Sequence, residues 1–250
     1  MTPATADSAV LKALGRAAVY RTLGSAFAYP TPPRLAELGH AADTAAGGEL
    51  PTGILEALTA FAAVAREADP QALADEHVFL FDRQVRCPPY EGAWGDAPQL
   101  AGKAAALADI AGFYDAFGLG ATGAQPDTED HIVAELEFMS ALAVKEAWAI
   151  GEEDQEGLEI TRQAERGFLA DHLGRWAPAF AEALRGVTPL PYYTAAAGLL
   201  EEWLRAEGDL LGVSPAACLG GPTDDPLQRE DAFSCPMAEP EPETEGTDQP

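Results

Sequence analysis

The sequence has few basic residues. Its 250 residues include 15 Lys and Arg but 41 Asp and Glu, which gives a formal net charge of −26 at pH 7. Nucleic-acid binding and docking on anionic membranes both require concentrated positive charge. The composition therefore excludes both kinds of partner, and it favours partners that are cationic.

Cysteines and long apolar runs are also scarce. Cys87, Cys218 and Cys235 are too few and too far apart for a disulfide framework, so we expect reduced thiols. The N-terminal region has no basic segment followed by an uninterrupted apolar run, so we expect no export signal. No run of about 18 apolar residues is present, which predicts no membrane insertion. Together these absences predict a cytoplasmic protein.

β-Branched residues are sparse, whereas Ala, Leu and Glu dominate and apolar residues recur at intervals of three and four. This spacing is typical of amphipathic helices. We therefore predict an all-α fold, a single helical-bundle domain of about seven or more helices. The predicted helices cover roughly residues 7–28, 52–68, 71–81, 100–117, 127–150, 154–186 and 190–207.

Two stretches depart from this periodicity. Residues 82–99 form a long connection rich in Pro and Gly, and connections of this length in compact domains are often functional. After residue 219 the apolar periodicity ends, and residues 222–250 hold nine acidic residues and one basic residue. We therefore divide the chain into an all-helical domain, residues 1–219, and an acidic, disordered tail, residues 220–250.

Motifs for catalysis and metal binding are absent or incomplete. No Cys-x-x-Cys occurs, and the Glu-x-x-His at residues 37–40 lacks the second copy that a four-helix di-iron site needs. Residues 118–123 match Gly-x-Gly-x-x-Gly, but a helix rather than a strand precedes them, which indicates a helix end and a turn. Cys87 has no local base motif, which favours a packed or exposed thiol over a nucleophile. We therefore predict no catalytic residues, no metal site and no cofactor.

One cluster of residues, in the long connection, is not explained by a helix end, a turn or a packed thiol. Leu80 and Phe81 are followed by the run Cys87-Pro88-Pro89-Tyr90-Glu91-Gly92-Ala93-Trp94. In one interpretation Tyr90 and Trp94 pin the loop to the core. In the other, the stiff Pro-Pro-aromatic segment presents apolar surface to a partner at little entropic cost.

Two further clusters lie on predicted helices. The run Pro126-Asp127-Thr128-Glu129-Asp130-His131 begins a helix, and its acids suit a helix N-terminus, with Asp127 as the candidate N-cap. Capping by these acids does not explain His131. In the first helix Tyr20 and Phe27 lie seven residues apart on one face, which core packing also explains.

Taken in order along the chain, these residues resemble the TorD/DmsD/NarJ family of redox-enzyme maturation chaperones. The resemblance covers roughly residues 10–207 and points to the branch that serves type II enzymes of the dimethyl sulfoxide reductase family. Thr128 and Glu129 interrupt the family's Pro-Asp-His arrangement, so we align its Asp-His with Asp130-His131. The matching segments are Tyr20-x-x-Leu23-x-x-x-Phe27, Leu80-Phe81, Pro88-Pro89-Tyr90-Glu91, Asp130-His131-Ile132-x-x-Glu135-Leu136-x-Phe138-Met139, Phe168-x-x-x-His172-x-x-x-Trp176-x-x-x-Phe180, Tyr192-Tyr193 and Leu199-Leu200.

The resemblance implies an all-helical cytoplasmic protein without enzymatic activity. Such proteins bind the apo form of a molybdenum enzyme's catalytic subunit, often through its twin-arginine signal peptide. They hold it until the molybdenum bis(molybdopterin guanine dinucleotide) cofactor is inserted, and so delay export. The family's client-binding residues, carried over to this chain, are Leu80, Phe81, Pro89, Tyr90, Trp94, Asp130 and His131, with Tyr20 as a further candidate.

The composition agrees with this implied function. A twin-arginine leader has a cationic segment followed by an apolar one, so its receptor should offer carboxylates beside an apolar groove. We therefore expect the aromatic loop and the acidic helix start to adjoin in space. Two alternatives stay open. One is a helical GTP-binding protein, for which the chain lacks a phosphate-binding loop, and the other is a permanent structural subunit of a reductase complex.

Overall fold

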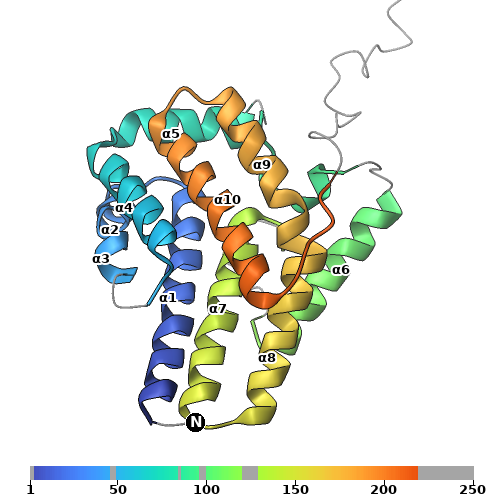
Figure 1. Ribbon diagram of the computed structural model, residues 1–250. Coiled ribbons are helices and arrows are strands. Elements are labelled where there is room, and N and C mark those ends of the chain that lie inside the picture. Colours follow the sequence, from blue (N-terminus) through green and yellow to red (C-terminus); the bar gives the residue numbers. More distant parts are fainter. Residues whose placement is uncertain (1–2, 46–48, 84–85, 96–99, 120–128, 219–250) are drawn as a thin grey trace, which may run out of the picture.

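The computed structural model describes residues 3–45, 49–83, 86–95, 100–119 and 129–218 (Figure 1). Within these ranges the chain forms α-helices with short 3₁₀ and π turns and no β-strand, so the predicted all-α class is confirmed. The predicted acidic tail, Cys235, Pro126 and Asp127 lie outside the described residues. None of the described helices is both long enough and apolar enough to cross a membrane.

The centre of the fold is a pair of antiparallel helices, α1 (Pro3–Phe27) and α7 (Ile132–Gly151) (Figure 1). Ser140 Oγ of α7 donates a hydrogen bond of 2.9 Å to the carbonyl oxygen of Ala17 in α1. Further along α1, Gly24 lies against Leu136. The residue numbers rise on one helix as they fall on the other, which fixes the antiparallel register of the pair.

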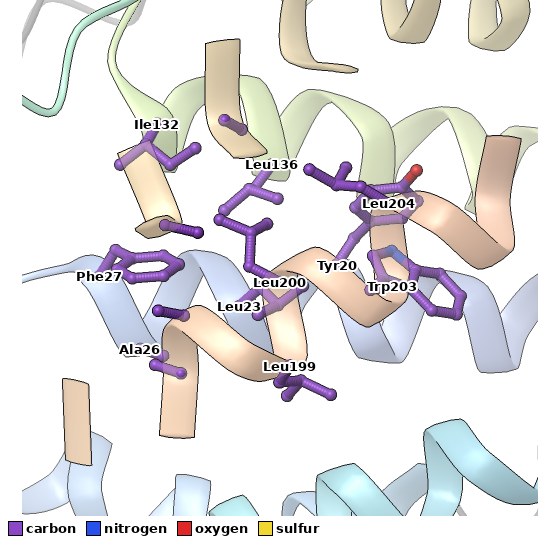
Figure 2. Close-up of a cluster of buried hydrophobic side chains, with 14 of the residues drawn as sticks. Tyr20, Leu23, Ala26, Phe27, Ile132, Leu136, Leu199, Leu200, Trp203 and Leu204 are labelled. Atoms are coloured by element: carbon purple, nitrogen blue, oxygen red, sulfur yellow. The ribbon is translucent and has the colours of Figure 1, made fainter. Parts of the chain in front are cut away.

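A third helix, α10 (Pro191–Leu211), packs against this pair and completes the main apolar core. Figure 2 shows Leu23 of α1, Leu136 of α7 and Leu200 of α10 in one buried cluster. The ring of Tyr20 lies edge-on to Trp203, with 5.3 Å between ring centroids. Burial of each such large apolar side chain contributes about 1.5–3 kcal/mol, so this cluster stabilises the arrangement of the three helices. The explanation that Tyr20 packs in the core is therefore confirmed.

The region after α1 contains two helices that the sequence did not predict, α2 (Pro32–Gly39) and α3 (Ala41–Ala45). Two prolines follow Thr31, and the sequence reasoning used them only as the end of the preceding helix. Proline is also well suited to the first helical positions, where its missing N–H has no intrahelical partner to lose. Buried Leu35 and Leu38 then hold α2 against α4 (Thr52–Glu67), which is followed by α5 (Pro70–His77).

The long helix predicted for residues 154–186 is divided in the structure. It consists of α8 (Gln155–Phe168), a π-helical turn (Leu169–Leu173) and α9 (Gly174–Val187). Pro178 of α9 cannot donate a hydrogen bond to the carbonyl of Gly174, which weakens the helix directly after the π turn. The predicted helical extent is therefore confirmed, whereas the π turn within it was not predicted.

The helix α6 (Leu100–Ala116) lies on the outside of the bundle, next to α8 and α9 in Figure 1. It ends as the sequence predicts, because Gly118 adopts a left-handed φ of 70° and the N–H of Leu119 donates back to the carbonyl of Tyr114. The other glycines of the 118–123 motif lie outside the described residues.

Candidate functional site

The aromatic loop, residues 86–95, lies directly against the residues that begin α7. Tyr90 and His131 form an isolated antiparallel bridge, and the N–H of Ile132 donates a hydrogen bond of 2.8 Å to the carbonyl of Pro89. The loop therefore pairs through its backbone with the start of α7. This confirms that the two clusters adjoin, as the sequence predicts.

Asp130 joins the same two segments with its backbone and its side chain. Its carbonyl accepts from the N–H of Glu91 at 2.9 Å, and its Oδ2 accepts from the N–H of Gly92 at 3.1 Å. The residue is only 2% exposed. In this conformation the Asp130 carboxylate holds the loop and is not presented to solvent.

His131 is the N-cap of α7. Its Nδ1 accepts a hydrogen bond of 3.1 Å from the N–H of Val133, which replaces one of the partners that a helix start lacks. The ring of Tyr90 lies edge-on to the imidazole, with 5.0 Å between centroids. Capping therefore does account for His131. The candidate N-cap named from the sequence, Asp127, lies outside the described residues.

Trp94 fixes the other end of the loop to the core. Its Nε1 donates a hydrogen bond of 2.9 Å to the carbonyl of Pro88, and its ring lies 6.4 Å from Trp176 and 6.2 Å from Phe180. The side chain is 8% exposed. The structure thus bears out the interpretation in which the loop is pinned to the core.

Most of the other predicted site residues are enclosed as well. Leu80 and Tyr20 are fully buried, Phe81 is 6% exposed and Pro89 is buried, whereas Tyr90 keeps part of its side chain at the surface. We expected these side chains to line an open groove. This expectation is wrong for most of them, because they pack in the hydrophobic core instead. Their role in client binding stays a prediction.

The loop also contacts a buried histidine that the sequence reasoning did not select. His172 Nδ1 lies 3.1 Å from Glu91 Oε2, and its Nε2 lies 3.2 Å from Asp109 Oδ2 in α6. Both ring nitrogens must donate to satisfy two carboxylates, which only the imidazolium can do. Burial lowers the pKa of His172, but the two carboxylates outweigh burial and the pKa is raised. A positive charge thus joins the loop to α6.

Glu135, in the first turn of α7, lies beside this group and is completely buried. Trp176 Nε1 donates to its two carboxylate oxygens at 3.2 and 3.1 Å. Burial and the charge of Glu91 raise the pKa of Glu135 well above its ordinary value, which favours the protonated acid. The carboxylate that contacts His172 is that of Glu91 rather than that of Glu135.

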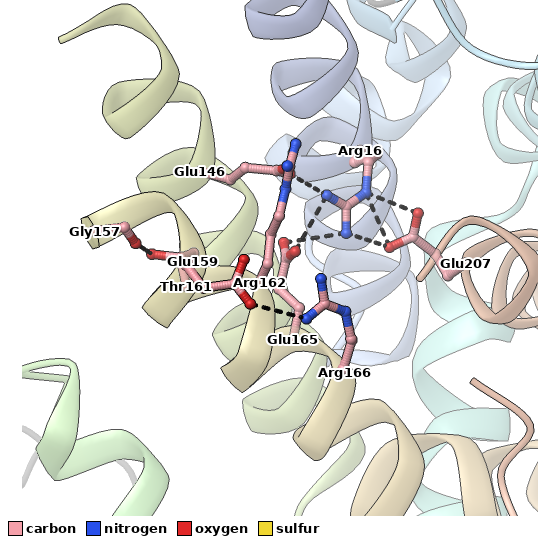
Figure 3. A network of polar contacts seen from close by, with 9 residues as sticks. All are labelled: Arg16, Glu146, Gly157, Glu159, Thr161, Arg162, Glu165, Arg166 and Glu207. Carbon is pink, nitrogen blue, oxygen red and sulfur yellow. Dashed lines mark hydrogen bonds and ion pairs between the residues drawn. The ribbon is translucent and has the colours of Figure 1, made fainter. Parts of the chain in front are cut away.

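A second buried polar group centres on Arg16 of α1 (Figure 3). The guanidinium contacts carboxylates from three other helices: Glu207 of α10 with hydrogen bonds of 2.8 to 3.1 Å, Glu165 of α8 with an ion pair of 3.1 Å, and Glu146 of α7. Tyr20 donates a hydrogen bond of 3.0 Å to Glu207. This explains Tyr20 as part of the group that joins α1 to α10.

Sequence reasoning could not select these groups because acidic residues occur throughout the chain. One signal was present: Glu135, His172 and Trp176 already stand in the segments that carry the family resemblance. Among the described residues, no group of three or more His, Cys, Asp and Glu side chains could hold a metal ion. The two buried groups are thus ion-pair and hydrogen-bond networks between helices.

Comparison with known proteins gives a consistent set of relatives. The chaperone protein TorD of Aeromonas salmonicida is 29% identical over 153 residues, covering 61% of this chain and 67% of the relative. The perchlorate reductase assembly chaperone of Dechloromonas aromatica is 30% identical over 133 residues, with 52% and 58% covered. The selenate reductase assembly chaperone of Thauera selenatis is 35% identical over 95 residues, with 38% and 47% covered.

For most of these relatives the matched segment spans about half of the relative's own length, ranging from 37% to 67%. The sequence profile described as nitrate reductase delta subunit matches residues 48–182, more than half of the 250 residues. The matched region contains the aromatic loop, the start of α7 and the π turn with His172. The chain therefore belongs to the nitrate reductase delta subunit family, which includes the TorD- and NarJ-type chaperones that its motifs resemble.

Proposed function

We propose that this protein is a cytoplasmic maturation chaperone for the catalytic subunit of a molybdenum oxidoreductase of the dimethyl sulfoxide reductase family. It binds this subunit, its client, in the apo form, assists insertion of the molybdenum cofactor and has no catalytic activity of its own. The observation that carries the proposal is family membership, together with relatives named as assembly chaperones of perchlorate, selenate and chlorate reductases.

Binding of the client's twin-arginine leader is part of the proposal. The net charge of −26 favours association with a cationic segment, and Tyr90 offers a partly exposed aromatic ring beside the start of α7. In this proposal Tyr90 contacts the client. Asp130, Trp94 and Pro89 act as positioning residues, because their contacts hold the loop that carries Tyr90.

The test is capture of the client by the tagged chain. The apo catalytic subunit of a candidate client, a molybdenum reductase from the same organism, is produced in cells that lack molybdenum cofactor, with and without its leader, and the leader is also prepared as a peptide. We expect the full apo subunit to be captured and the cofactor-loaded enzyme to be released. Failure to capture any of the three forms would contradict the proposed function.

A matched pair of variants tests the contact at the loop. Tyr90→Ser should weaken leader binding, since a partly exposed aromatic anchor is lost. Tyr29→Ser removes another surface tyrosine, one that lies outside the loop, and should leave binding unchanged. Equal affinities for the two variants would remove Tyr90 from the proposed contact.

The family's description as a subunit favours one second candidate, a permanent component of the mature enzyme. Purification of the mature, cofactor-loaded reductase distinguishes the two. A maturation chaperone is absent from the purified enzyme, whereas a permanent subunit is present in a fixed ratio.

A further inference from the structure

Large apolar side chains gather on one exposed face of the central helix pair. Leu11 and Leu14 of α1 are 42% and 44% exposed, and Val144 and Trp148 of α7 are 48% and 62% exposed. The hydrogen bond from Ser140 to Ala17 sets the register, which places Leu14 opposite Val144 and Leu11 opposite Trp148. We call these four residues the apolar strip.

The apolar strip continues into a hollow of about 580 Å³ between α1, α2 and α7. Leu14 and Val144 belong to both, and Ala18, Leu38 and Ala41 line the hollow further along. Exposed apolar surface that runs into a concavity is typical of sites that bind another protein. From Leu11 to Ser25, at its far end, α1 rises about 21 Å, the length of a helix of about 14 residues.

The end of the apolar strip away from the hollow is acidic. Glu152 and Glu153 follow α7 directly, and the antiparallel register brings Asp7 of α1 to the same end. All three are exposed, and none makes an ion pair within the part of the chain that the structure describes. The surface therefore has carboxylates at one end and apolar side chains along the strip. In the hollow, apolar side chains alternate with polar ones, which are Arg21, Thr22, Ser25, Glu37, His40 and Ser140.

We infer that the apolar strip and the hollow are a second docking surface, which binds an amphipathic helix of the client with basic residues at one end. The inference rests on the proposed function only in naming the client as the source of that helix. The apolar face of the helix covers Leu14, Val144 and Trp148, and its basic end lies over Glu152 and Glu153. This surface is separate from the aromatic loop, which contacts the opposite end of α7.

The charge distribution argues against two other occupants. A second copy of this chain would carry the same net charge of −26, so the two copies would repel each other. An anionic bilayer would be repelled for the same reason. A basic amphipathic helix gains from both the charge and the apolar surface.

Trp148 provides a direct readout of this surface. It is 62% exposed, whereas Trp94, Trp176 and Trp203 are 8%, 0% and 1% exposed, so acrylamide quenching of tryptophan fluorescence reports mainly on Trp148. The probe is a Trp-free 18-residue peptide with Leu on one helical face and two Arg at its N-terminus. We expect the peptide to protect Trp148. A peptide with two Glu in place of Arg should bind at least about tenfold more weakly.

Variants distinguish binding at this surface from nonspecific binding to exposed apolar residues. Leu14→Ser and the double variant Glu152→Lys/Glu153→Lys should each weaken the Arg peptide by about tenfold. Leu210→Ser is the matched control, because Leu210 is 63% exposed but lies on α10. Equal loss with the control would overturn the inference. So would protection of Trp148 by lipid vesicles or by a rise in the chain's own concentration.

Photo-crosslinking tests the client itself, with a photoreactive amino acid at position 144 or, as a control, at position 210 of the full chain. We expect the captured apo subunit to crosslink at position 144 and not at position 210. Capture of the client without a crosslink at position 144 would overturn the second docking surface and leave the proposed function intact. Failure to capture the client at all would overturn the proposed function.

Discussion

The buried carboxylate of Glu165 should make the stability of this protein depend on pH. Three buried carboxylates surround Arg16, and the second cation, Arg162, pairs with Glu146 and is partly exposed. Burial raises the pKa of Glu165 to about 7, and the attraction of Arg16 lowers it only in part. Glu165 therefore binds a proton in the folded protein at pH values where it is ionised in the unfolded chain.

The sign and size of the effect follow from linkage. Below pH 4.5 Glu165 is protonated in both states, so its full contribution to stability is present. As the pH rises from 4.5 to about 7, the unfolded chain ionises Glu165 but the folded protein still binds the proton, so the free energy of unfolding falls. The difference between 4.5 and about 7 corresponds to a loss of about 3 kcal/mol across that range.

Urea unfolding followed by circular dichroism at pH 4.5, 6, 7 and 8 measures this loss. Glu165→Gln removes the titrating group but keeps an oxygen that accepts from Arg16, so the free energy of unfolding should fall less steeply with pH than in the unmodified protein. The unfolding free energy of the variant minus that of the unmodified protein should therefore be about 3 kcal/mol larger at pH 8 than at pH 4.5.

Glu159→Gln is the matched control, because Glu159 also lies on α8 but its side chain is 71% exposed. Its unfolding free energy should follow the unmodified protein at every pH. Parallel curves for Glu165→Gln and the unmodified protein would refute the reasoning, since the buried charge would then have no cost.

Three further substitutions test other contacts by urea unfolding. Trp94→Ala should lower the unfolding free energy by about 3–5 kcal/mol, because a buried ring is lost; a loss below about 1 kcal/mol would mean the loop is not packed. Asp130→Ala leaves the N–H of Gly92 without its partner and should cost about 1–3 kcal/mol and speed hydrogen exchange at Gly92; unchanged exchange would contradict the contact. Tyr20→Phe removes the hydrogen bond to Glu207 and should cost about 1 kcal/mol; no loss would indicate a replaced partner.

The fold class could be predicted because helical periodicity is a local property. Apolar residues at intervals of three and four predict a helix wherever the chain lies. Pro32 shows the limit of local reasoning: a proline that ends one helix can also begin the next, and only the burial of Leu35 and Leu38 against α4 decides that α2 forms.

The candidate site was predictable in its composition but not in its exposure. The reasoning that a receptor for a cationic and apolar leader needs carboxylates beside an apolar groove correctly placed the aromatic loop next to the start of α7, where Tyr90 pairs with His131. Whether Trp94 or Leu80 faces a partner or the core depends on which surfaces pack against it, and packing is a property of the whole chain.

The sequence by itself determined the net charge, the helical class and the residues that carry the family resemblance, because each depends on residue identity and spacing alone. Only the tertiary structure decided which of the 41 acidic residues lose their water: Glu135 and Glu165 are buried, whereas Glu152 and Glu153 stay exposed beside the apolar strip. The physical reason is that the cost of ionising a carboxylate depends on the groups that folding brings around it.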